Sequence, residues 1–378
     1  MIYLDNAATT KPSEAAVQAA HAAMVNFGNP SSLHGAGLTA EKAVEGTRRI
    51  IAQEMGVKAK HIYFTSGGTE ANNTAVFGTA YRLAPRGRHV ITTKIEHPSV
   101  LEPFKMLEKK GFDVTYLDVN SDGVVNLEQM ADSLNENTTF VSVMHVNNET
   151  GVIQPVEQIK EIIRKKSPNA LFHVDAVQSF GKLPVQPLKW GADLLSVSAH
   201  KVHGLKGTGA LYIADGVHIN PLLHGGGQQS GVRPGTENTA GIAAFGAAIS
   251  EFDTSVAFSY MTELRNFMKK RLIDEIPDIK INGSDRYSAG SVLNASFIGI
   301  KAEILLHALE ARGVYVSTGS ACSAHHPAPS HVLTAMGCTR GEIMGAVRFS
   351  FERAVTIEDI NEAVDIIREE AARIPKIR

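Results

Sequence analysis

Hydrophobic positions in the first two thirds of the chain occur in short, almost continuous runs. Between about residues 60 and 215, runs rich in β-branched residues alternate with helical patterns: HIYFT, HVITT, FDVTYL, TFVSVMH, LFHVD, DLLSVS and GALYI. Runs without polar alternation are typical of strands that are covered on both faces. The order therefore predicts an α/β fold with a largely parallel, seven-stranded sheet and helices on both faces.

The pattern changes in the last third of the chain. A helical periodicity runs from Asn238 through Phe252 to Ile276, and three apolar runs then appear among helical segments: SVLNASF, VYVS and AVRFSF. This mixture predicts a smaller α+β domain. We expect the large domain to span 15–254, and the small domain to combine 1–14 with 255–378.

The last helix is expected to begin after a capping signal formed by Thr356 and Asp359. Apolar residues then recur at helical spacing: Ile357, Ile360, Val364, Ile367 and Ala371. A stripe of this kind is typical of a helix face that packs on a core, so it is not interpreted as a binding site.

Composition and charge exclude several classes of protein. The chain has 378 residues, 43% of them hydrophobic. A chain of this length is too long for a single hydrophobic core, so two domains are expected. A formal net charge of −2 gives no general attraction for nucleic acid or anionic membranes, so neither is expected as a direct partner. No signal-peptide pattern or long apolar run is present. Because Cys322 and Cys338 are the only cysteines, a disulfide framework is excluded, and a soluble cytoplasmic protein is expected.

Candidate chemistry gathers in SVSAHKVHGLKGTGALYI, residues 196–213. A predicted strand ends there, and Ser198, His200 and Lys201 follow before three glycines. Ligands of open α/β sheets bind at the carboxyl ends of strands. Lys201 therefore has two interpretations. It is either a solvated surface charge, the commoner case, or a lysine that forms a Schiff base with a carbonyl cofactor.

A Schiff-base lysine for pyridoxal 5′-phosphate requires an acid at the ring nitrogen and donors for the phosphate. Asp175 ends the apolar run LFHVD, where a carboxylate needs a cation or donors, although a helix-capping role also fits. FTSGGTEANN places Gly67, Gly68 and Thr69 between a strand and a helix, and amides at a helix N-terminus bind phosphate. Each signal alone is weak, but three requirements met at successive strand ends favour this cofactor.

Further motifs extend along almost the whole chain. They are YLDNAATT, GNPSSLHGAG, FTSGGTEANN, IEHPSVL, MHVNNETGVIQP, FHVDAVQSFGKLP, SAHKVHGLKGTGALY, GGGQQSGVRPGTEN, STGSACSAHHPAPSHVL and VRFSF. With these motifs the chain resembles the cysteine desulfurases of the NifS and IscS type, which are class V, fold-type-I pyridoxal-phosphate enzymes. The resemblance implies a fold-type-I transferase architecture and L-cysteine as the substrate.

The resemblance also implies roles for individual residues around the cofactor. Lys201 corresponds to the Schiff-base lysine, Asp175 to the acid at the pyridine nitrogen, and His97 to an imidazole that stacks on the ring and transfers protons. The remaining cofactor contacts fall on Gln178 and Asn148 near the ring hydroxyl, and on Gly68, Thr69, Ser198 and His200 at the phosphate.

Three further roles follow from the same resemblance. Arg348 corresponds to the guanidinium that binds the substrate carboxylate. Asn148 corresponds to a residue that also contacts the substrate. Thr236 corresponds to a residue that reaches the phosphate in the neighbouring subunit, which implies a homodimer with shared sites. Cys322 corresponds to the nucleophile that takes the substrate sulfur as a persulfide and passes it to an acceptor protein, such as an iron–sulfur scaffold or a thiolation enzyme.

Several alternatives remain open from the residues. Cys322, His325, His326 and His331 have spacings that a zinc site would allow, although the desulfurase pattern explains Cys322 and no native metal is expected. Cys338 is interpreted as structural. A selenocysteine lyase, a cysteine-sulfinate desulfinase or a class V aminotransferase would share Lys201, Asp175 and Arg348. A non-enzymatic scaffold that binds metal or partners through the histidine-bearing segment is a further alternative.

Overall fold

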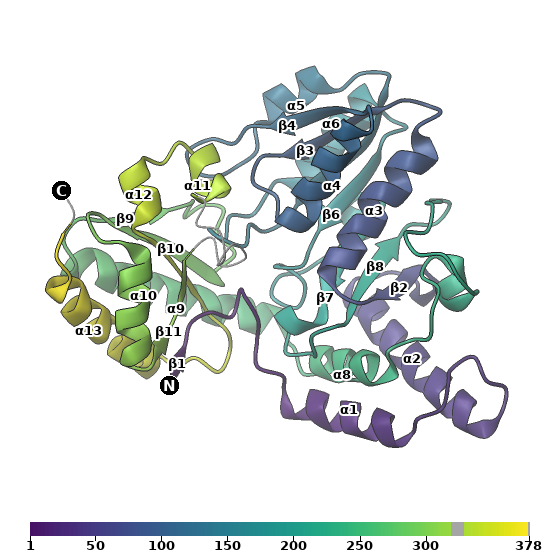
Figure 1. Ribbon diagram of the computed structural model, residues 1–378, viewed down its shortest axis with the longest axis horizontal. Helices are drawn as coiled ribbons and strands as arrows, with labels where there is room; N and C mark the ends of the chain where they lie inside the picture. The colour runs from purple at the N-terminus through teal and green to yellow at the C-terminus, as the bar shows by residue number, and fades with distance from the viewer. Residues whose placement is uncertain (319–328, 377–378) are drawn as a thin grey trace.

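The computed structural model describes residues 1–318 and 329–376. Cys322, His325 and His326, which the sequence marks as candidates, lie outside the described residues. Figure 1 shows a larger lobe built around one sheet and a smaller lobe that contains the last third of the chain together with the N-terminal strand.

The larger lobe contains a seven-stranded sheet in the order β2-β8-β7-β6-β5-β3-β4. Its strands are β2 (Ile62–Thr65), β3 (His89–Thr93), β4 (Asp113–Leu117), β5 (Thr138–Met144), β6 (Leu171–Asp175), β7 (Leu194–Ser198) and β8 (Gly209–Ile213). Only β8 runs against its neighbours, β2 and β7. The predicted α/β class and largely parallel sheet are therefore confirmed, and each of the seven apolar runs forms one strand.

Helices cover both faces of this sheet, and each face has its own apolar core. One core joins α3 (Gly68–Leu83) and α4 (Pro98–Lys109) to the strands. On the other face a larger core contains residues of α2 (Gly35–Glu54), α5 (Leu127–Ser133), α6 (Val156–Lys166), α7 (Pro187–Trp190) and α8 (Thr239–Ser250). The remaining helices of this lobe are α1 (Glu14–Val25) and the 3₁₀ segments η1 (Ala59–His61), η2 (Ala199–Lys201) and η3 (Gln228–Gly231). Burial on both faces explains why the strand sequences lack polar alternation.

The smaller lobe is an α+β unit. Its antiparallel sheet has the order β12-β13-β10-β9, with β9 (Ile279–Asn282), β10 (Val292–Phe297), β12 (Ser317–Thr318) and β13 (Ala346–Ser350), and a parallel pair joins β1 (Ile2–Tyr3) to β11 (Val314–Tyr315). Its helices are α9 (Thr254–Glu275), α10 (Ala302–Ala311), α11 (His331–Ala335), α12 (Arg340–Met344) and α13 (Ile357–Arg373). One apolar core contains Ile2 and Leu4 together with residues of α9, α10 and α13. The exact domain boundaries stay a prediction.

Two details of the sequence prediction are wrong. The helical pattern from Asn238 to Ile276 is two helices, because the Asp253 carboxylate accepts hydrogen bonds from the backbone amides of Ser255 and Val256 and so begins a new helix. The run VYVS is not one strand either: β11 pairs with β1, whereas β12 pairs with β13.

The last helix begins as predicted. Thr356 and Asp359 form a reciprocal capping box at the start of α13. Of the predicted apolar stripe, Ile360, Val364, Ile367 and Ala371 are buried, and Ile357 packs against the same core. Within the described part of the chain, no helix has the length and apolar character needed to cross a membrane.

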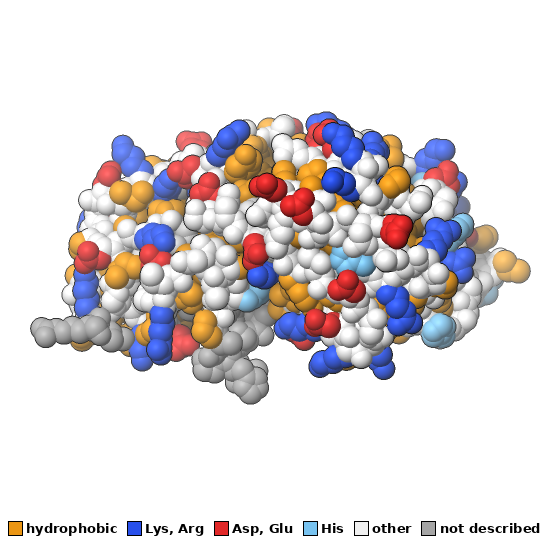
Figure 2. Space-filling model, turned by 90° about the horizontal axis from the view of Figure 1, so that it is seen from above, with side chains coloured by type: hydrophobic (Ala, Val, Ile, Leu, Met, Phe, Trp, Pro, Cys, Tyr) orange, Lys and Arg blue, Asp and Glu red, His pale blue; other side chains and the backbone are white. Residues whose placement is uncertain are grey.

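Charged side chains are mixed on the face of the molecule that Figure 2 shows. Lysine and arginine side chains alternate there with aspartate and glutamate, and no broad area of one sign is visible. This distribution agrees with the small net charge of −2.

Candidate active site

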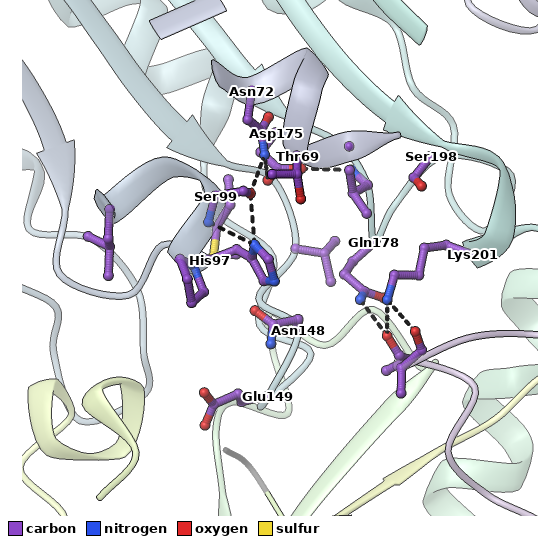
Figure 3. A pocket seen from close by; sticks show the side chains of 18 of the residues that line it. Thr69, Asn72, His97, Ser99, Asn148, Glu149, Asp175, Gln178, Ser198 and Lys201 are labelled. Carbon is purple, nitrogen blue, oxygen red and sulfur yellow. Dashed lines mark hydrogen bonds between the residues drawn. The ribbon is translucent and has the colours of Figure 1, made fainter. Parts of the chain in front are cut away.

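A cavity of about 580 Å³ lies at the carboxyl ends of the parallel strands. Its walls come from three sources: the N-terminal segment at Ala7 and Ala8, the strand ends of the large sheet, and Arg348 of β13. Ten of the predicted site residues line it, namely Gly68, Thr69, His97, Asn148, Asp175, Gln178, Ser198, His200, Lys201 and Arg348. Figure 3 shows many of these side chains converging on one space.

Lys201 reaches into this cavity from η2, directly after β7. Its ammonium donates hydrogen bonds to the carbonyls of Ala7 and Ala8, both at 2.7 Å. The N-terminal segment thereby holds the amine among the other cavity residues (Figure 3). A backbone carbonyl only accepts hydrogen bonds, so these two contacts hold the Lys201 amine in position without reacting with it.

Asp175 is buried at the end of β6 and lines the same cavity as this lysine. Burial raises the pKa of its carboxyl, while hydrogen bonds from the Val177 amide and Asn72 and the charge of Lys201 act in the opposite direction. The Val177 amide donates to Oδ1 at 2.9 Å and Asn72 donates to Oδ2 at 2.7 Å. A carboxyl held in this way is suited to a protonated ring nitrogen, because a buried carboxylate is stabilised by a cation.

A chain of hydrogen bonds connects Asp175 to His97. The amide of Asn72 donates both to Asp175 and, at 2.8 Å, to the hydroxyl of Ser99. That hydroxyl lies 2.7 Å from Nδ1 of His97, which also accepts from the backbone amide of Ser99 at 3.1 Å. We infer that the neutral ring carries its proton on Nε2, since Nδ1 is an acceptor.

The surroundings of His97 favour the neutral form of its imidazole. Burial, followed by the charges of Lys201 and His331, lowers the pKa of its imidazole to about 4. The ring nitrogen away from Ser99 points into the cavity (Figure 3). A neutral imidazole in this position is able to exchange protons with a ligand.

The N-terminus of α3 faces the cavity and is suited to an anion. Gly67 has a φ of 152°, and a side chain at Gly68 would place its Cβ 2.8 Å from Val177 Cγ2. The buried hydroxyl of Ser198 lines the same cavity and has no hydrogen-bond partner among the described residues. A hydroxyl without a partner, beside the free amides of a helix N-terminus, fits the phosphate of pyridoxal 5′-phosphate. The phosphate oxygens would accept hydrogen bonds from the hydroxyl and from the amides.

Arg348 brings a buried guanidinium to the cavity from β13. Its two terminal nitrogens donate to Asp5 Oδ1 at 2.7 Å and to the Asn148 carbonyl at 3.0 Å. Within the described residues its Nε has no partner. Asp5 and the Asn148 carbonyl therefore orient this guanidinium, and its Nε–H remains available as a hydrogen-bond donor.

Other predicted residues lie apart or have modest contacts. Thr236 is exposed and does not line this cavity, so its action across a subunit interface stays a prediction. Nδ1 of His200 lies 3.2 Å from the Thr9 hydroxyl, and burial lowers the pKa of this imidazole to about 4. Cys338 is half-buried with its sulfur 3.8 Å from Asn282 Oδ1, in agreement with a structural role.

Among residues 1–318 and 329–376 there is no cluster of three side chains that could hold a metal ion, but this absence does not test the zinc alternative. His331 lines the cavity and donates from Nε2 to the Glu96 carbonyl at 2.9 Å. The other three candidate ligands lie outside the described residues.

The sequence prediction missed Asn72, Ser99, Asp5 and Glu149. Asn72 and Ser99 stand within FTSGGTEANN and IEHPSVL, and Asp5 within YLDNAATT. Their presence in these motifs was the only signal in the sequence that they could belong to the site. The motifs alone do not predict which polar side chains form hydrogen bonds with one another. Glu149 lines the cavity, and burial raises the pKa of its carboxyl to about 7.

Comparisons with known proteins agree with this geometry. The family described as aminotransferase class-V matches residues 2–362. A cysteine desulfurase IscS from Dictyoglomus turgidum is 42% identical, over 97% of this chain and 93% of its own length. A solved structure described as a NifS-like protein superimposes with a TM-score of 0.93 at 39% identity, covering 99% of this chain and 100% of the other. Another, described as SspA in complex with cysteine, has a TM-score of 0.82 at 34% identity and covers 93% and 99%.

Matches of this extent, together with the predicted fold-type-I architecture, establish the relationship. The chain belongs to the aminotransferase class-V family and, within it, to the cysteine desulfurases of the NifS and IscS type.

Proposed function

We propose that this chain is a pyridoxal 5′-phosphate-dependent cysteine desulfurase that converts L-cysteine to L-alanine and leaves the sulfur as a persulfide on Cys322. The observation that carries the proposal is the convergence of Lys201, Asp175 and the orphaned Ser198 hydroxyl on one cavity. Each of these groups meets a different requirement of the same cofactor.

The residues present fit the cofactor along its whole length. Lys201 would hold its carbonyl carbon, Asp175 its ring nitrogen, and Gln178 with Asn148 the region of its ring hydroxyl. The phosphate would be held by Gly68, Thr69, Ser198 and His200. When bound, pyridoxal 5′-phosphate supplies an electron sink that stabilises negative charge at the α-carbon of an amino acid.

The protein's own residues would divide the remaining work. Arg348 binds the substrate carboxylate, and His97, neutral at pH 7, exchanges a proton with the substrate. The thiolate of Cys322 attacks the substrate sulfur. A sulfur–sulfur bond forms, the bond between the substrate's β-carbon and sulfur breaks, and the carbon takes up a proton. L-Cysteine and one protein thiol thus become L-alanine and one protein persulfide.

We further propose that the enzyme is a cytoplasmic homodimer and passes its sulfur to an acceptor protein. The name IscS is carried by curated relatives such as that of Dictyoglomus turgidum. The exposed position of Thr236 is compatible with a contact to a second subunit. The acceptor would be a protein of iron–sulfur cluster assembly, tRNA thiolation or cofactor biosynthesis.

The test is intact mass and peptide mapping after brief exposure of the purified enzyme to L-cysteine without reductant. We expect one added sulfur on the peptide that contains Cys322, and L-alanine in solution. Cys322→Ala should lose the added sulfur, whereas the matched variant Cys338→Ala should keep it. An unmodified Cys322 in cofactor-loaded wild-type protein, with no alanine released, would overturn the proposal in favour of an aminotransferase.

A further inference from the structure

A buried lysine, Lys182, contacts the cavity residue Gln178 but lacks a role in the reaction described above. Its side chain is 5% exposed, and its ammonium donates to Oε1 of Gln178 at 3.3 Å. Burial of an ammonium group is costly because it loses hydration. A buried lysine next to the reactive centre therefore requires a physical explanation.

The hydrogen bond from Lys182 belongs to a network that ends at Lys201. Nε2 of Gln178 donates to the Ala7 carbonyl at 2.9 Å, and the same carbonyl accepts from Lys201 at 2.7 Å. Figure 3 shows Gln178 and Lys201 side by side with dashed lines to the same segment. Lys182 is thus connected to the reactive lysine through one amide and one carbonyl.

The two contacts of Gln178 determine which way its amide faces. Its oxygen meets a cation and its nitrogen meets a carbonyl. The reversed orientation would place the NH₂ group against the ammonium of Lys182 and the oxygen against the carbonyl of Ala7. Both contacts would then be repulsive, so a single orientation is favoured.

This orientation has a consequence for the cavity. An amide nitrogen carries two hydrogens, and the Ala7 carbonyl accepts only one of them. Since Gln178 lines the cavity, the second N–H is available to a ligand there. Under the proposed function, that ligand atom is the ring oxygen of the cofactor.

We propose that Lys182 is a positioning residue that presents an N–H of Gln178 to the ring oxygen of the cofactor and thereby lowers the proton affinity of the Lys201 nitrogen in the loaded enzyme. This inference rests on the proposed function. A hydrogen bond to the ring oxygen draws negative charge away from the neighbouring nitrogen, so a proton on that nitrogen is less stabilised.

Electrostatic repulsion also connects Lys182 to Lys201. Burial, followed by the charges of Lys201 and Arg348, lowers the pKa of Lys182 to about 7, and Glu352 opposes them. Burial is the main reason why the pKa values of His200 and His203 are lowered, and the charge of Lys182 adds to that effect. Whatever positive charge Lys182 carries also disfavours a proton on Lys201. Removal of Lys182 should therefore raise that proton affinity.

The experiment is a spectrophotometric pH titration of the bound cofactor in the holoenzyme. In Lys182→Met we expect the apparent pKa of the absorbance change to rise by about one pH unit, because the contact that orients the Gln178 amide is lost. Lys182→Arg, which keeps the donor and the charge, should titrate close to the wild type. Lys160→Met, which removes another largely buried lysine paired with Asp193, is the matched control and should leave the titration unchanged.

A double-mutant cycle separates orientation of the amide from a general effect of charge. If Lys182 acts through Gln178, Lys182→Met should have a much smaller effect in a Gln178→Ala background. Equal effects in both backgrounds, or a Lys182→Met protein that titrates like the wild type, would overturn the inference.

Two further measurements keep the result interpretable. Gln178→Glu retains Lys182 but presents an oxygen to the ring oxygen, so the apparent pKa should also rise. An unchanged titration in this variant would contradict the inference even if Lys182→Met does not fold. Borohydride reduction of wild-type protein should label Lys201, and absence of that label would mean failure of the proposed function itself.

Discussion

The carboxylate of Glu149 accepts a 2.6 Å hydrogen bond from the hydroxyl of Ser330, and this contact joins the carboxyl edge of the large sheet to the start of α11. The same hydroxyl accepts from the backbone amide of Leu333 and so caps that helix. Both partners are buried and line the cavity. The contact therefore fixes the segment that directly follows residues 319–328.

Glu149→Gln should become more stable relative to the wild type as the pH rises. Burial raises the pKa of Glu149 from its ordinary value to about 7, so its favourable contribution to folding is complete below about pH 4.5 and is lost as pH rises through 7. Glutamine keeps an acceptor for Ser330 without this loss. We expect a relative gain of about 1–3 kcal/mol between pH 5 and pH 8, measured by urea unfolding.

Ser330→Ala is the companion variant for this contact. It removes a helix cap and a donor, and should lower the unfolding free energy by about 1–2 kcal/mol at pH 5. The loss should grow as the pH rises, because the hydrogen bond from Ser330 lowers the pKa of Glu149. A Glu149→Gln protein with the same pH dependence as the wild type would contradict the role assigned to burial of Glu149.

Ser198→Ala should have opposite effects on the apoprotein and on cofactor binding. The Ser198 hydroxyl is buried and lacks a partner in the described protein, so alanine should leave apoprotein stability unchanged or raise it by about 1 kcal/mol. Loss of a phosphate donor should weaken pyridoxal 5′-phosphate binding about tenfold. Ultrafiltration or fluorescence titration measures the affinity.

The matched control for Ser198 is Ser142→Ala. The Ser142 hydroxyl is also buried, but it lies 2.8 Å from Nδ1 of His173 and outside the cavity lining. It should destabilise the apoprotein by about 1 kcal/mol and leave cofactor affinity unchanged. If both variants weaken cofactor binding equally, the assignment of Ser198 as a phosphate donor is contradicted.

Arg348→Lys should raise KM for L-cysteine about 30- to 100-fold with little change in kcat, because charge-assisted hydrogen bonds to a carboxylate are lost. Asp5→Asn should raise KM by a smaller factor of about 3–10, since Asp5 only orients the guanidinium. Arg353→Lys, an exposed arginine of the same lobe, is the control and should behave like the wild type. An unchanged KM in Arg348→Lys would remove its assignment to the substrate carboxylate.

Ser99→Ala interrupts the hydrogen bonds between Asn72 and His97 while leaving both side chains in place. The imidazole of His97 would lose one of its two contacts at Nδ1. We expect kcat to fall about tenfold while KM changes little, because proton transfer depends on the position of the ring. Unchanged steady-state kinetics would show that the contact from the Ser99 backbone amide alone positions His97.

The large sheet was predictable because its strands are buried on both faces, and this burial makes the apolar runs continuous. The break at Asp253 was missed because apolar periodicity continues across it. The signal for that break was local: an aspartate followed by Thr254 and Ser255 is a typical helix start.

Ten residues that the motifs singled out line one cavity, whereas the partners that orient those residues were not predictable from the motifs. Asn72 and Asp175 are 103 positions apart, and Arg348 and Asp5 are 343 positions apart. Such contacts depend on the order of strands in the sheet and on how the N-terminal segment crosses the cavity. A single sequence contains no periodic signal for either feature.

Acid should destabilise the protein through histidines that are buried in the neutral form, and His145 provides the clearest test. Its ring packs on Trp190 with a centroid distance of 4.3 Å, and burial lowers its pKa from 6.5 to about 4. The contribution to stability is complete above pH 6.5 and is lost as pH falls towards 4, because the unfolded chain binds the proton first. His145→Phe keeps an aromatic ring without a titrating group. Between pH 7.5 and 4.5 it should lose about 2–3 kcal/mol less unfolding free energy than the wild type. Equal losses in urea unfolding would show that His145 is protonated without cost in the folded state.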